Sequence, residues 1–88
     1  MGCKEAMKTY VKVNSDFDAT GYMQPRAITW KDGRTFRIDA VKDLWPGNRG
    51  DRYTVVIQGE ERYLYYERPS ELQLNRYGRW YVLSGESA

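Results

Sequence analysis

The chain has 88 residues, a formal net charge of +2 and one cysteine, Cys3. A chain of this length forms one small domain, so we take 1–88 as a single domain with flexible tails at 1–6 and 84–88. The lone cysteine excludes an intrachain disulfide and favours the reducing cytoplasm. No apolar run approaches the roughly 18 residues of a membrane span, so no membrane role is expected.

The first predicted strand runs from Met7 to Phe17. Its odd positions up to Val13 carry apolar or β-branched side chains, whereas its even positions are mostly polar, which is the alternation of a half-buried strand. A turn follows at 18–21. The next strand begins near Pro25, because proline suits the start of a strand better than its centre.

The pattern of residues 28–39 predicts a β-hairpin around the pair Asp32-Gly33. A three-residue loop with Gly33 in the left-handed conformation, as a G1 bulge, pairs Trp30 with Arg34. A slip of one residue would expose half of the apolar set. In the chosen register one face carries Ile28, Trp30, Phe36 and Ile38.

Beyond this hairpin the alternation loses phase. A bulge near 39–40 would return Val41 to the core face and bend the strand. Residues 45–51, with one proline and two glycines, form the most loop-like segment. We expect Trp45 to plug the end of the barrel, with an exposed anchor as the alternative.

A second hairpin is predicted from 52–58 and 61–67. Taking Gly59-Glu60 as a two-residue turn pairs Val55 with Leu64. Both faces of this hairpin are apolar or aromatic, although a one-sided sheet is usually polar outside. The second face is therefore expected to be covered or used, either by packing of Tyr63 and Tyr65 within the sheet or by a partner.

The C-terminal part contains a short strand or 3₁₀ turn at 72–74, a turn at 75–78 and a last strand at 79–83. There is no convincing amphipathic helix. The fold class is therefore all-β: a small, strongly bent antiparallel meander closing into an SH3-like barrel of five to six strands. An OB-like barrel is the alternative, but Pro46-Gly47 opposes the helix that this fold usually carries.

Part of the sequence resembles a group of small uncharacterised bacterial proteins of about this length. The resemblance covers most of residues 9–83 and is carried by the run 28–41, Arg52-Tyr53-Thr54, the run 63–66 and Trp80-Tyr81-Val82. It implies a compact all-β domain of the SH3-like barrel type. It implies no activity and no functional residues.

The residue types argue against an enzyme. The chain has no histidine, which removes the usual Ser-His-Asp and Cys-His catalytic arrangements and the commonest metal ligand. The glycines match neither a P-loop nor a dinucleotide fingerprint. We therefore expect no catalytic residue, no metal, no cofactor and no small-molecule substrate.

Arginine and aromatic residues carry the functional hypotheses instead. Nine of the 14 basic residues are arginine, and the chain has eight tyrosines and three tryptophans. Such side chains dominate protein interfaces and also bind single-stranded nucleic acids. The leading hypothesis is a non-catalytic binding module for another protein or for self-association, and the alternative is a single-stranded DNA- or RNA-binding domain. The candidate binding residues are Arg37, Trp45, Arg49, Arg52, Tyr63 and Tyr65.

Overall fold

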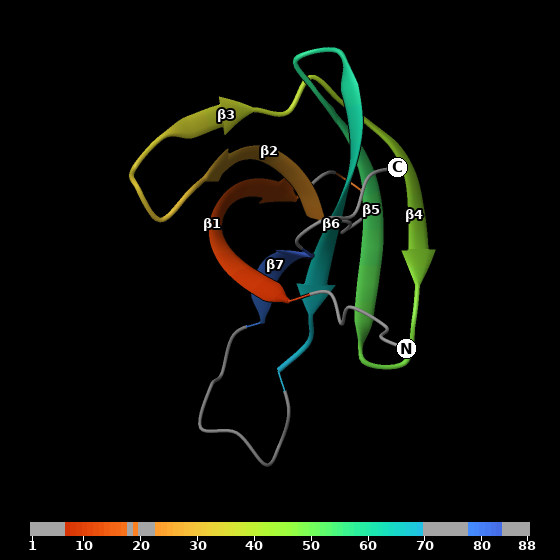
Figure 1. Cartoon of the computed structure of the whole chain (residues 1–88). Helices are drawn as coiled ribbons and strands as arrows, with labels where there is room; N and C mark the ends of the chain where they lie inside the picture. The colour runs from red at the N-terminus through yellow and green to blue at the C-terminus, as the bar shows by residue number, and fades with distance from the viewer. Residues whose placement is uncertain (1–6, 18, 20–22, 70–77, 84–88) are drawn as a thin grey trace, which may run out of the picture.

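The computed structural model describes residues 7–17, 19, 23–69 and 78–83. These residues form one sheet of seven antiparallel strands in the order β3-β2-β1-β7-β6-β5-β4 (Figure 1). The strands are β1 (Lys8–Phe17), β2 (Met23–Thr29), β3 (Thr35–Arg37), β4 (Ala40–Pro46), β5 (Gly50–Ile57), β6 (Glu60–Glu67) and β7 (Arg79–Leu83). The sheet curls strongly into a half-barrel, which confirms the prediction of a small, strongly bent antiparallel barrel. The predicted count of five to six strands is too low, because the segment expected to form one long strand is divided into β3 and β4. Within the described ranges, no helix has the length and apolar character needed to cross a membrane.

The two ends of the sheet are joined by a link of two residues, Ile38 and Asp39, between β3 and β4. The N–H of Ile38 donates to the carbonyl of Arg26 on β2, and the N–H of Asp39 donates to the carbonyl of Val56 on β5, both at 2.8 Å. The link therefore ties β2 to β5 and makes the sheet barrel-like. Sequence reasoning treats this segment as one strand with a bulge, whereas the structure divides it into two strands.

The edge strand β4 is shielded against pairing with another chain. Its bulge lies between Val41 and Asp43 rather than at 39–40, and Val41 is 37% exposed, so the prediction that Val41 rejoins the core is wrong. The Asp43 carboxylate accepts the N–H of Leu44 at 2.9 Å, and Pro46 offers no N–H. A bulge, the charged Lys42 and a proline are features that natural edge strands use to avoid aggregation.

The first hairpin has the predicted register. Ile28 pairs with Phe36, and the N–H of Trp30 donates to the carbonyl of Arg34 at 2.9 Å. Gly33 has a φ of 90°, which is the left-handed conformation that the three-residue loop requires. Hydrophobic alternation and one glycine were sufficient to define this register because the contacts are local.

The second hairpin is shifted from the predicted register by two residues. Tyr53, not Val55, pairs with Leu64, and the turn residues are Gln58 and Gly59. Their φ values of 53° and 79° are those of a type I′ turn. A shift of two keeps every side chain on its predicted face, because the side-chain period of a strand is two.

The core lies inside the curl. Trp80 on β7 contacts the rings of Tyr53 and Tyr66, with centroid distances of 5.3 and 4.9 Å. The Tyr53 hydroxyl donates to the carbonyl of Met23 at 3.3 Å and so connects β5 to β2 across the interior. Burial, together with the charge of Asp51, raises the pKa of Tyr53, so the hydroxyl remains a donor. Within the described residues, the buried core cluster consists of Ile28, Ile38, Tyr53, Val55, Leu64 and Trp80, and Pro25 is also fully buried.

The type I′ turn predicts opposite effects for two adjacent substitutions. Gln58→Asn should raise the free energy of unfolding by about 0.5 kcal/mol, or the Tm by about 2–4 °C, because asparagine tolerates the left-handed region better than glutamine. Gly59→Ala should lower the free energy of unfolding by about 1–2 kcal/mol. An added Cβ at Gly59 meets no atom within 4 Å, so this cost is conformational. Thermal and urea unfolding measure both, and destabilisation by Gln58→Asn would contradict the assigned turn.

Candidate functional site

Five side chains stand opposite one another across five neighbouring strands, on the face of the sheet that points away from the core. Tyr10 on β1 pairs with Tyr81 on β7, and Tyr81 pairs with Tyr65 on β6. Tyr65 pairs with Arg52 on β5, which pairs with Trp45 on β4. We call these five residues the outer row. Its continuity follows from the strand order β1-β7-β6-β5-β4.

The tyrosines of the outer row pack against one another and against a cation. The rings of Tyr65 and Tyr81 stack at 5.0 Å and 7°, and Tyr10 meets Tyr81 edge-on at 5.8 Å. Tyr63, beside the row on β6, meets Tyr65 at 6.5 Å. The Lys8 ammonium lies 4.7 Å from the Tyr81 centroid. Much of the ring surface is thus already covered by other side chains of the same chain.

Arg52 connects the tyrosines to Trp45. Its guanidinium carbon lies 4.5 Å from the Tyr63 centroid and 5.8 Å from the Trp45 centroid. The Arg52 Nε is buried and has no hydrogen-bond partner among the described residues. Arg52 is therefore positioned by aromatic contacts rather than by a carboxylate.

The Trp45 side chain is exposed to solvent and does not close the end of the barrel. It is 61% exposed, and its indole Nε1 donates to the Asp43 carboxylate at 3.0 Å. The prediction that Trp45 plugs the barrel end is wrong, because β4 continues to Pro46 and its alternation places Trp45 with Arg52 on the outer face. The exposed alternative is the one the structure shows.

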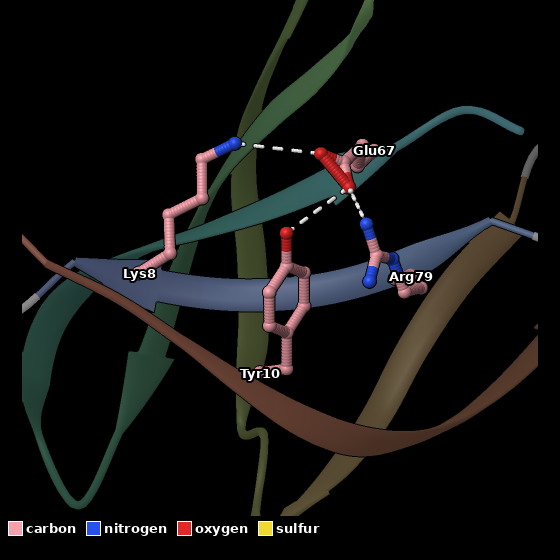
Figure 2. Close-up of polar contacts among 4 residues, drawn as sticks. All are labelled: Lys8, Tyr10, Glu67 and Arg79. Carbon is pink, nitrogen blue, oxygen red and sulfur yellow. Dashed lines mark hydrogen bonds and ion pairs between the residues drawn. The ribbon is translucent and has the colours of Figure 1, made fainter. Parts of the chain in front are cut away.

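At the other end of the outer row, one carboxylate joins three strands (Figure 2). Glu67 on β6 accepts from Lys8 at 3.4 Å, from the Tyr10 hydroxyl at 3.2 Å and from Arg79 at 2.9 Å. Burial acts to raise the pKa of Glu67, but the hydrogen bonds and charges of Lys8 and Arg79 outweigh it, and the pKa is lowered. Glu67 is ionised at neutral pH and holds β1, β6 and β7 together.

The turn between β4 and β5 carries Arg49 and is fixed by Arg68. The Arg68 guanidinium donates to the carbonyl of Gly47 and to the Asp51 carboxylate, both at 2.6 Å. The backbone N–H of Arg68 donates to the carbonyl of Arg49 at 2.9 Å. These bonds hold the turn against the end of β6, so the position of Arg49 is defined although its side chain is exposed.

An open groove of about 600 Å³ lies between the outer row and this turn. Both carboxylates that line it have cationic partners: Asp51 pairs with Arg68, and Glu67 pairs with Lys8 and Arg79. Within the part of the chain that the structure describes, the side chains of Arg49 and Arg52 have no ion pair. The groove is lined by Lys8, Trp45, Gly47, Arg49, Gly50, Asp51, Arg52, Tyr65, Tyr66, Glu67 and Tyr81.

The structure brings together five of the six candidate binding residues. Arg37 lies on β3, three strands from β6 in the sheet order, and among the described residues no cation–π contact joins it to a tyrosine. The sequence hypothesis missed Tyr10 and Tyr81. Both lie on the polar side of alternating strands, but only the strand order shows that they continue the row. The residues that gather are Trp45, Arg49, Arg52, Tyr63 and Tyr65.

Comparison with protein-family models, with curated protein sequences and with solved structures finds no match for this chain. The structure by itself shows a small all-β domain. Among the residues the structure covers, no group of three or more His, Cys, Asp or Glu side chains is placed to hold a metal ion.

The lowered pKa of Glu67 predicts a pH dependence of stability. Ionised Glu67 stabilises the fold at pH values above its usual pKa of about 4.5, and this contribution is lost as the pH falls through the lower pKa of the folded state. Glu67→Gln should therefore lower the free energy of unfolding near neutral pH, by about 1 kcal/mol or less. The gap between wild type and variant should close in acid.

Urea unfolding across a pH series measures this gap. Glu61→Gln is the matched control, because Glu61 is also on β6 and makes a single exposed ion pair, with Lys42 at 3.3 Å. It should have a smaller effect at neutral pH. A Glu67→Gln difference that does not change with pH would contradict the stabilising role of the ionised carboxylate.

Proposed function

We propose that this chain is a non-catalytic binding module that binds a partner protein through the outer row. The observation that carries the proposal is the unbroken line of tyrosine, arginine and tryptophan side chains across five strands. These three residue types dominate interface hot spots. Because the side chains already hold one another in place, binding would cost less rotamer entropy than it would for free side chains.

The charge distribution supports a protein partner. The charges around the outer row have both signs: Lys8 and Arg79 flank Glu67 on the outer face. Asp51 also lines the groove, although it pairs with Tyr66 on the core side of the sheet. A surface of mixed sign complements the mixed surface of a protein better than it complements a uniform polyanion. The stacked rings of Tyr65 and Tyr81 also leave less open ring surface for nucleic-acid bases.

Single-stranded DNA or RNA binding is the second candidate, supported by one observation. The exposed ring of Trp45 lies beside Arg49 and Arg52, and the structure shows no ion pair for either arginine within the described residues. Aromatic rings next to unpaired cations are what single-stranded nucleic acids bind. Affinity for oligothymidylate that falls steeply with salt would support this candidate over the first.

Cellular context is also a proposal. The single cysteine supports a reducing cytoplasmic location. The pattern of the 28–41 hairpin and the later strands supports kinship with the small bacterial proteins that the sequence resembles.

A selection experiment tests the leading proposal. A phage-displayed library of random peptides is panned on the immobilised chain, and the selected peptides are measured against variants. Trp45→Ala should weaken binding at least about tenfold, as expected for an exposed hot spot. Arg37→Ala, on the distant strand β3, is the matched control and should bind like wild type. Peptides that bind both variants equally, or no enrichment at all, would refute binding at the outer row.

Self-association is the special case in which the partner is a second copy. If the outer row pairs with itself, sedimentation equilibrium should show a dimer that Trp45→Ala converts to monomer. A wild-type chain that remains monomeric at high concentration rules out self-association and leaves a different protein as the partner.

A further inference from the structure

We propose that the groove beside the outer row recognises an acidic segment of the partner protein. The carboxylates of this segment would bind Arg49 and Arg52, and an adjacent apolar or aromatic residue would pack on Trp45. This inference rests on the proposed function, since it names the chemistry of the partner at the same surface.

The first step is the state of the acidic side chains in the groove. Asp51 accepts from Arg68 at 2.6 Å, and Glu67 is surrounded by Lys8 and Arg79. Both carboxylates are therefore committed to other cations. The groove retains the positive charge of Arg49 and Arg52, for which the described part of the chain supplies no carboxylate partner.

The second step is that the Arg52 guanidinium is already held in an orientation that can bind a carboxylate from another molecule. Tyr63 and Trp45 hold the guanidinium by cation–π contacts, and the Nε is buried without a hydrogen bond. The two terminal nitrogens make no hydrogen bond to a described residue, and they are not among the buried atoms. They form a fixed fork, the geometry that binds carboxylate through two parallel hydrogen bonds.

The third step distinguishes an acidic peptide from a nucleic acid. A nucleic-acid strand carries a negative phosphate at every nucleotide, whereas among the described residues that line the groove only two cations, Arg49 and Arg52, lack a carboxylate partner. An acidic segment of a protein can place its carboxylates at Arg49 and Arg52 and neutral residues next to Asp51 and Glu67. Two unpaired cations match the few carboxylates of an acidic peptide better than the continuous charge of a nucleic-acid strand.

Titration of the ¹⁵N-labelled chain tests the inference. The probe is the capped peptide Glu-Tyr-Glu-Leu-Glu, and the comparison probes are its Gln-Tyr-Gln-Leu-Gln counterpart and oligothymidylate. NMR follows the Arg52 Nε–H and the Trp45 indole N–H. We expect the acidic peptide to shift both signals and to bind at least about tenfold more tightly than the glutamine peptide.

Two variants and one control locate the effect. Arg49→Gln and Arg52→Gln should each weaken the acidic peptide about tenfold, whereas Arg37→Gln should not change it. Arg49 is exposed and its side chain has no partner among the described residues, so Arg49→Gln should keep the wild-type spectrum even if Arg52→Gln perturbs folding.

Three outcomes would overturn the inference. Equal affinity for the acidic and glutamine peptides would show that the carboxylates do not contribute to binding. Tighter binding of oligothymidylate than of the acidic peptide would show that the groove is a nucleic-acid site. Absence of shifts at Arg52 and Trp45 removes the groove as the site. If library peptides still depend on Trp45 while charge has no effect, acidic recognition fails but the proposed function stands; if no peptide binds the outer row, the proposed function itself fails.

Discussion

The fold depends on the last strand, β7, entering the sheet between β1 and β6. Its alternate residues serve both faces: Trp80 fills the core, and Tyr81 links Tyr10 to Tyr65 outside. Without β7 the sheet would separate into two meanders, β1–β3 and β4–β6, connected by the link at Ile38. The β1–β7 pairing joins distant parts of the chain, so its loop-closure entropy must be offset by contacts such as those of Trp80.

This dependence explains what sequence reasoning could and could not predict. Alternation predicts the other strands and their buried faces, but not the division between β3 and β4 or the exposed side chain of Val41. The register of the first hairpin follows from the position of Gly33, because that signal is local. Strand order is not local. The expectation that Arg37 approaches the tyrosines assumed adjacent hairpins, and β2, β1 and β7 lie between them. The same missing information concealed Tyr10 and Tyr81 as members of the outer row.

Two other errors have local physical causes. Placing the second turn at Gly59-Glu60 assumed that the glycine occupies the first turn position, whereas Gln58 takes up a left-handed φ of 53° there. The backbone N–H of Gln58 donates to the Asp39 carboxylate at 3.2 Å, a contact with a distant segment that supports this turn. Trp45 was expected to plug the end of the barrel, but Asp43 provides an acceptor for its indole N–H on the outer face.

The two ends of the outer row differ in what they offer a ligand. At the β1–β7 end, Glu67 already satisfies Lys8, Tyr10 and Arg79, so a ligand that engaged these groups would have to replace existing hydrogen bonds. At the β4–β5 end, the Arg49 and Arg52 guanidiniums have no such bonds to give up within the described residues. Net binding energy should therefore concentrate near Trp45, with the tyrosine end acting as the rim that excludes water. The Glu67 carboxylate, which links β1, β6 and β7, thus pairs the cations at one end of the outer row and, among the described residues, leaves unpaired arginines only at the other end.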